Sequence, residues 1–121
     1  MLLKVKSSED LQTVLEELRI FLTEAQLLED IIFESKLVAC ELLGNVLRHA
    51  GGETALYCQT DGDCVEMKIY SEREFFLPET IVCSNERAEN GRGLFLVNEI
   101  CQGQMTSEKD GIRVRICVKK I

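Results

Sequence analysis

The stretch that decides the fold of this chain is Glu41-Leu-Leu-Gly-Asn45-Val-Leu-Arg-His49. It lies in a run from about Asp30 to Ala50 in which apolar residues recur three and four positions apart, the spacing of one face of a helix. The run stops at Gly51-Gly52, and glycine is the residue that most often ends a helix. The sequence therefore predicts one long helix in this part of the chain.

The polar residues of this predicted helix are confined to a narrow stripe. At about 100° per residue, the stripe contains Glu34, Glu41, Asn45 and Arg48, with His49 at its edge. A helix on a protein surface normally has a broad solvated face, so a stripe this narrow favours a helix that faces a cleft. An ordinary solvated edge with pairing between residues four apart is the alternative, and the spacing alone is compatible with both.

Glu41 and Asn45 are one helical turn apart, so a carboxylate and a carboxamide oxygen converge on one point. Oxygens in this arrangement can orient a water or a hydroxyl group and can ligate one Mg²⁺. Glu41 is therefore the candidate catalytic residue, and Asn45 is the candidate metal ligand. His49, one turn further along, is expected to be a hydrogen-bonding group beside the same site rather than a catalytic base.

A second signal is Gly91-Arg92-Gly93, which precedes an apolar helical segment from Leu94 to Cys101. Glycines before a helix let the backbone present free N–H groups at the positive end of the helix dipole, and such groups hold phosphate. The residues expected to bind phosphate are Gly91, Arg92, Gly93 and Leu94. An ordinary turn from a loop into a helix needs glycine as often as a phosphate site does. The glycine pair indicates a phosphate site more strongly because it follows the helix that contains Glu41 and Asn45.

The rest of the chain alternates between strand and helix patterns. Strands are expected at about residues 2–6, 54–60, 65–71, 104–108 and 112–119, a first helix at about 8–21 and a long loop at 72–90. The turns Asp61-Gly62-Asp63 and Lys109-Asp110-Gly111 each indicate a hairpin. This order predicts one α+β domain over residues 1–121, a two-layer α/β sandwich with helices on one face of a mostly antiparallel, mixed sheet.

Composition limits the classes of function. Hydrophobic residues make up 45% of the 121 residues and charged residues 29%, which is typical of a folded domain. The formal net charge of −7 repels nucleic acid and anionic lipid, so neither is an expected partner. No apolar run approaches the roughly 20 residues that span a bilayer, and the charged start of the chain does not resemble a signal peptide. A cytoplasmic location is therefore expected.

The cysteines are expected to be structural. There are six, and they include no CxxC pair: Cys40, Cys58, Cys64, Cys83, Cys101 and Cys117. A zinc site needs ligands paired on tight turns, so zinc is disfavoured. The sequence instead predicts buried free thiols that pack as small hydrophobic groups in a reducing cytosol.

The segments Glu41–His49 and Gly91-Arg-Gly-Leu-Phe-Leu-Val97 resemble two boxes of the histidine-kinase-like ATPases, and the resemblance covers nearly the whole chain. The small size and the ending Asp110-Gly-Ile-Arg-Val-Arg-Ile116 are most similar to the stand-alone bacterial anti-sigma-factor serine kinases. The resemblance implies the ATPase fold of that family and a site for ATP and Mg²⁺. In that site Glu41 would act as base, Asn45 would ligate Mg²⁺ and the two glycines would surround the triphosphate.

The chain departs from the family where the base of ATP would bind. The family has an Asp-x-Gly-x-Gly segment whose Asp reads the adenine amino group, and alignment back from Phe76-Leu-Pro-Glu79 places Ser71, Arg73 and Phe75 at these positions. A second adenine contact of the family is a Thr in the last hairpin, where this chain has Ile112. Because a site built on hydrogen bonds binds poorly once they are lost, Ser71 and Arg73 predict a changed base site. Apolar and basic side chains that simply fill this pocket are the alternative.

Two functions follow from the resemblance. One is a regulatory binding protein that holds a sigma factor or its small antagonist, with weak nucleotide binding. The other is an active serine/threonine kinase that uses ATP and Mg²⁺ to phosphorylate the antagonist, with Glu41 as base. The altered residues at the base site favour the first. Members of this family commonly form homodimers through their sheet edges and N-terminal segment, so a homodimer is also among the expectations.

Overall fold

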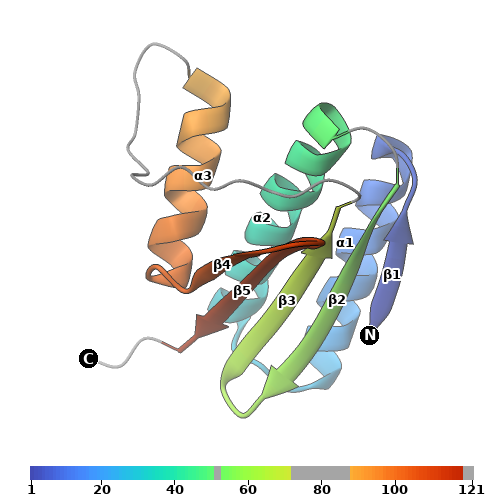
Figure 1. Ribbon diagram of the computed structural model, residues 1–121. Coiled ribbons are helices and arrows are strands. Elements are labelled where there is room, and N and C mark those ends of the chain that lie inside the picture. The colour runs from blue at the N-terminus through green and yellow to red at the C-terminus, as the bar shows by residue number, and fades with distance from the viewer. Residues whose placement is uncertain (51–52, 72–87, 119–121) are drawn as a thin grey trace.

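The computed structural model describes residues 1–50, 53–71 and 88–118, with the backbone alone at residues 49–50 and 88–94. In these residues three helices cover one face of a five-stranded sheet and leave the other face without a helix (Figure 1). The predicted α+β sandwich is confirmed. No helix in the described residues is both long enough and apolar enough to span a membrane.

The elements follow the sequence patterns closely, with differences at the helix ends. They are β1 Leu2–Val5, α1 Ser8–Glu24, α2 Glu29–Asn45, the short π-helix η1 Val46–Ala50, β2 Thr54–Asp61, β3 Cys64–Tyr70, α3 Ala88–Cys101, β4 Met105–Glu108 and β5 Gly111–Cys117. α1 extends to Glu24, past the predicted end near Phe21. The predicted long helix is helical throughout, but its last turn is the π-helix η1.

The strand order in the sheet is β1-β2-β3-β5-β4, and each of these neighbouring pairs is antiparallel. The described strands therefore contain no parallel pair, although the sequence had predicted a mixed sheet. In the register, Leu56 lies opposite Ile69 and Ile69 lies opposite Ile112. Because side chains alternate along a strand, these three residues share one face of the sheet, and all three are fully buried.

The core lies between that face and the helices. It contains the following residues of the first two helices: Val14, Leu15, Leu18 and Leu22 from α1, and Val38, Ala39, Leu42 and Leu43 from α2. Full burial of one such leucine stabilises the fold by about 2 kcal/mol. α2 contacts α1, α3 and three of the strands, so it occupies the centre of the helix layer. Residues on the side of α2 that faces α3 are consequently held by a rigid element.

Candidate functional site

The polar stripe predicted from the sequence lies on α2 and η1. Asn45 is the last residue of α2, and only 6% of it is exposed. Glu41, one turn earlier, is half-buried, and Arg48 on η1 is exposed. Leu43, on the opposite side of α2, is fully buried in the core. The stripe therefore combines a buried amide with a carboxylate that solvent can still reach.

Arg48 binds the amide oxygen of Asn45. Its Nη2–H donates a hydrogen bond to Asn45 Oδ1 over 2.5 Å. The guanidinium lies over Gly44, where a Cβ atom would stand 3.2 Å from Arg48 Nη1, so a larger residue at this position would crowd it. Oδ1 is the atom of Asn45 that would ligate a metal, because the amide nitrogen is a donor. A metal ion at Asn45 therefore requires Arg48 to turn away.

The protein supplies few ligands for Mg²⁺ at this point. Glu41 and Asn45 offer oxygens, and the described residues contain no group of three or more His, Cys, Asp or Glu side chains that could hold a metal ion. Mg²⁺ in nucleotide sites is commonly bound by one or two protein oxygens, with substrate phosphates and waters completing the shell. The two residues fit a Mg²⁺ that arrives together with phosphate groups, and Mg²⁺ alone would be poorly held.

Glu41 and Arg48 exert opposite electrostatic effects on one neighbouring thiol. Burial raises the pKa of the Cys40 thiol above its ordinary value. The Glu41 carboxylate raises this pKa further, whereas the Arg48 guanidinium lowers it. Both charges thus act within electrostatic range of the same thiol at this end of α2. This end of the helix therefore carries one negative charge, on Glu41, and one positive charge, on Arg48.

α3 packs beside α2 and runs in the opposite direction (Figure 1). Cys101, at the end of α3, lies near Glu34 on α2: burial raises the pKa of this thiol to about 12, and the Glu34 carboxylate adds to the rise. Both helices rise about 1.5 Å per residue. Counting back along α3 from Cys101 and forward along α2 from Glu34 places Gly91–Leu94 about level with Glu41–Asn45. The antiparallel pairing thus brings the two sequence signals to the same end of the molecule.

The glycine pair does not open α3 as predicted. α3 begins at Ala88, so the predicted start at Leu94 is wrong, and residues 88–90 of the predicted loop are helical. The physical reason is that Ala-Glu-Asn can form a first helical turn, with an acidic residue at the positive end of the dipole. The N–H groups of the first four residues of a helix lack helical partners. The free donors of α3 are therefore those of Ala88 to Gly91, one turn before the predicted position.

Ser71 and Ile112, two residues that predict a changed base site, lie at one end of the sheet. Ser71 follows β3 and is 7% exposed, and its N–H donates a hydrogen bond to the carbonyl oxygen of Asp110 over 2.9 Å. Ile112 is fully buried opposite Ile69, which lies two residues before Ser71. This end of the sheet thus has a serine and a hydrocarbon side chain at the two positions where the sequence predicts a changed base site.

Several predicted site residues are not described in full. Arg73 and Phe75 lie outside the described residues, and for His49, Arg92 and Leu94 the backbone alone is described. The part of the site that the structure describes consists of the stripe on α2, the backbone of α3 and the end of the sheet at Ser71.

The described fold has a five-stranded antiparallel sheet and a central helix, α2, that carries a polar stripe. The helix α3 lies beside this stripe. Residues 5–118 match the family model described as the histidine kinase-like ATPase domain. The chain belongs to this family. The matched span contains all three helices and four of the strands in full, and it confirms at family level the resemblance carried by the two segments. Among curated proteins, none matches the chain significantly.

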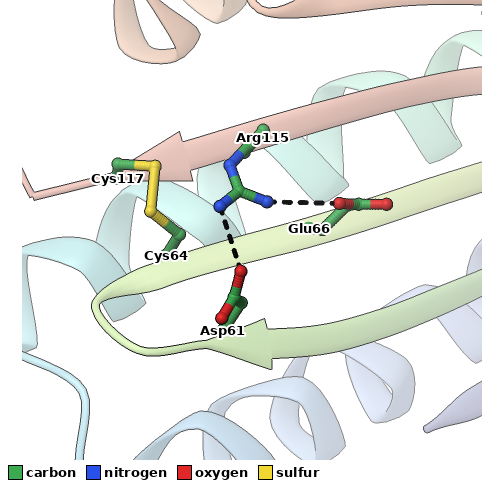
Figure 2. Close-up of a disulfide and its surroundings, with 5 residues drawn as sticks. All are labelled: Asp61, Cys64, Glu66, Arg115 and Cys117. Carbon is green, nitrogen blue, oxygen red and sulfur yellow. Dashed lines mark hydrogen bonds and ion pairs between the residues drawn. A yellow bond between two sulfur atoms is a disulfide. The ribbon is translucent and has the colours of Figure 1, made fainter.

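This histidine kinase-like ATPase domain also contains a disulfide that the sequence interpretation missed. Cys64 and Cys117 are bonded to each other, so the prediction of free thiols at these two positions is wrong (Figure 2). Their strands, β3 and β5, pair antiparallel with the two cysteines directly opposite. Three of the predicted free thiols are confirmed and Cys83 lies outside the described residues; the free ones are Cys40, Cys58 and Cys101.

Proposed function

We propose that this domain is a transcriptional regulator that acts by holding a partner protein, either a sigma factor or a small antagonist of that factor, with weakened binding of ATP. The observation that carries the proposal is the combination of an ATPase-family fold with Ser71 and Ile112 at the base end of the site. A domain that retains the fold and loses its adenine contacts is suited to binding a protein. Because sigma factors act in the cytoplasm, the proposal places the chain there.

The base end supports weak and unselective nucleotide binding. Ser71 is nearly buried, and its side chain is too short to replace an aspartate that reaches the adenine amino group. Ile112 has no hydrogen-bonding group and is fully buried. Loss of one hydrogen bond in a binding site costs about 1–3 kcal/mol, which corresponds to roughly ten- to a hundredfold in affinity. ATP and GTP should therefore differ little.

The helix layer supports a protein partner. α1 carries five acidic residues and α2 four, against one basic residue in each. Leu28, the residue before α2, is 60% exposed, and Phe33, near the start of α2, is 66% exposed. Phe33 also lines a groove of about 380 Å³ together with Leu27 and Ile32. The groove is also lined by Arg19, Lys36 and Glu29. An apolar anchor of the partner fits the groove, while basic groups beside it would meet the acidic residues of the two helices, so association would be faster at low salt.

The test is a binding measurement between the purified chain and the sigma factors and antagonists encoded in the same genome. We expect one of them to bind, and we expect Phe33→Ser to weaken this binding at least tenfold. Leu96→Ser is the matched control, because Leu96 is also an exposed apolar residue but lies on α3, away from the groove. Failure of every such protein to bind the folded chain would contradict the proposal.

A kinase is the second candidate, and the accessibility of Glu41 one turn from Asn45 favours it. In a kinase the Glu41 carboxylate would accept the proton of a serine hydroxyl on the antagonist while the γ-phosphoryl group is transferred. Glu41→Gln should then abolish phosphate transfer and leave partner binding intact. Glu34→Gln, on the same stripe, is the control. In a pure binding protein the native chain transfers no phosphate, and Glu41→Gln changes nothing.

A homodimer is part of the proposal. β1 and β4 are the edges of the sheet, and each has only four residues. An edge strand offers unpaired N–H and C=O groups to a second copy. Sedimentation of the native chain over a range of concentrations would determine whether it dimerises.

A further inference from the structure

The Cys64–Cys117 bond lies on the face of the sheet opposite to the helices. Their neighbours Val65 and Ile116 point into the core and are buried, so the two cysteines, which alternate with them, point outward. Both cysteines are partly exposed. Figure 2 shows the bond at the end of β3 and β5, next to Arg115. The bond therefore lies outside the hydrophobic core, on the face of the sheet that the described helices leave uncovered.

The other described cysteines are poorly reactive. Cys58 is fully buried and Cys101 is 1% exposed, and burial raises the pKa of each thiol to about 12. Burial also raises the pKa of Cys40 above its ordinary value. Because the thiolate is the reactive form, these three thiols are weak nucleophiles near neutral pH. Within the described residues, thiol chemistry is concentrated at the Cys64–Cys117 pair.

The bond closes one end of the ladder between β3 and β5. The Cα atoms of Cys64 and Cys117 are 4.1 Å apart, close to the spacing of a cross-strand pair that exchanges no backbone hydrogen bonds. Arg115 adds ion pairs to Asp61 and Glu66, both at 3.3 Å, and Figure 2 shows both beside the bond. Ion pairs near the surface contribute little to stability. Apart from the backbone hydrogen bonds of the ladder, the disulfide is therefore the main link between the two strands at this end.

The opposite end of the same ladder is held differently. Lys68 Nζ donates a hydrogen bond to Asp110 Oδ1 over 2.7 Å, and the Ser71 N–H binds the Asp110 carbonyl oxygen over 2.9 Å. Tyr70 and Gly111 are paired there as well. Loss of the disulfide would consequently loosen β5 at Cys117 and leave its Gly111 end, next to Ser71, in place.

We propose that Cys64–Cys117 is a reversible redox site, reduced by a dithiol protein of the thioredoxin class, and that its state determines whether the end of β5 is fixed to β3. The inference rests on the proposed function only for its cytoplasmic location, where disulfides are usually transient or redox-sensing. A buried structural disulfide in a secreted protein is the contrasting case, and the exposure of this pair distinguishes the two.

The exchange follows ordinary thiol chemistry. A thiolate of the dithiol attacks one sulfur of the pair, the Cys64–Cys117 bond breaks, and the other sulfur leaves as a thiolate and takes up a proton. The second thiol of the dithiol then attacks the mixed disulfide, releasing the first sulfur, which is also protonated. Two electrons and two protons move to the protein, and the dithiol is oxidised to its disulfide. Oxidised dithiol returns the protein to the bonded state by the reverse steps.

The experiment compares the full native chain before and after treatment with reduced thioredoxin at neutral pH. We expect alkylation and mass measurement to show two additional reactive thiols, at Cys64 and Cys117, in protein that is still folded. Amide hydrogen exchange should increase at residues 114–118 and stay unchanged at Gly111 and Ile112. The melting temperature should fall by about 10 °C, since a disulfide that closes a long loop chiefly restricts the unfolded chain.

Cys117→Ser should reproduce the reduced state, whereas Cys40→Ser should behave as the native chain. A disulfide that thioredoxin leaves intact until the protein unfolds would overturn the proposal, and so would reduction that changes neither hydrogen exchange nor melting temperature. None of these measurements involves a sigma factor, an antagonist or a nucleotide. Failure of the proposed function would therefore leave this result standing, and failure here would leave partner binding untouched.

Discussion

The guanidinium of Arg48 donates a hydrogen bond to the amide oxygen of Asn45, the last residue of α2. Asn45 is 6% exposed, so its Oδ1 has little room for a second ligand while the guanidinium is in place. An arginine remains charged at every physiological pH, so it repels a metal ion that approaches the same atom. A metal ion bound at Asn45 would therefore require a different position of Arg48.

Arg48→Gln should increase the affinity of the nucleotide-free chain for Mn²⁺, used as a probe for Mg²⁺. Removal of one nearby positive charge from a partly exposed site is worth about 1 kcal/mol, or roughly fivefold in affinity. Water-proton relaxation during a Mn²⁺ titration measures this directly. Arg19→Gln is the control, because Arg19 lies on α1 and pairs with Glu16. An unchanged Mn²⁺ affinity in Arg48→Gln would show that Arg48 does not hold a metal ion away from this site in the nucleotide-free chain.

Ser71→Asp combined with Ile112→Thr should tighten ATP binding by roughly ten- to a hundredfold and should tighten GTP binding much less. The two changes introduce a carboxylate and a hydroxyl at the positions that the proposal assigns to the base end of the site. Calorimetric titration with each nucleotide in the presence of Mg²⁺ is the measurement. Ile112→Val is the control, since it alters the same buried position without adding a hydrogen-bonding group. Tight, adenine-selective binding by the native chain would refute the expectation.

Much of the fold could be predicted because its signals are local. The helical spacing before Gly51 and the two hairpin turns at Gly62 and Gly111 depend on residues within a few positions of one another, and each predicted element is present. The polar stripe with Glu41 and Asn45 was visible for the same reason. A helix that begins before a glycine pair was missed, because the preceding Ala-Glu-Asn carries a weaker signal than the glycines do.

The disulfide and the contact between Arg48 and Asn45 could not be predicted. Cys64 and Cys117 are 53 positions apart, and they meet only because β3 and β5 pair in the register that places Ile69 opposite Ile112. That register depends on how both strands pack against the helices, and a shift of one residue would separate the sulfur atoms. The guanidinium contact depends on η1, and a π-turn has no clear sequence signature.

Gly111→Ala should lower the free energy of unfolding by about 3 kcal/mol. Gly111 has a φ of 153°, and a Cβ atom there would lie 2.1 Å from the carbonyl oxygen of Ile69, so β3 and β5 would have to separate. Gly62→Ala is the matched control: its φ is 60°, but a Cβ atom would meet nothing within 4 Å. Its cost should be about 1 kcal/mol, from backbone conformation alone. Equal urea midpoints for the two variants would contradict the close approach of the Ile69 carbonyl oxygen to Gly111.

Ser35→Ala and Thr54→Val should change stability in opposite directions, although each removes one buried hydroxyl. Ser35 is fully buried in α2, and its Oγ has no hydrogen-bond partner among the residues that the structure describes. Alanine therefore removes an unsatisfied polar atom and improves helix propensity. Thr54 is 4% exposed and its hydroxyl donates a hydrogen bond to the Tyr70 carbonyl oxygen. We expect a gain of about 1 kcal/mol for Ser35→Ala and a loss of about 1–2 kcal/mol for Thr54→Val, measured by urea denaturation. Destabilisation by Ser35→Ala would contradict this expectation. It would indicate that the Ser35 hydroxyl binds a buried water inside the core.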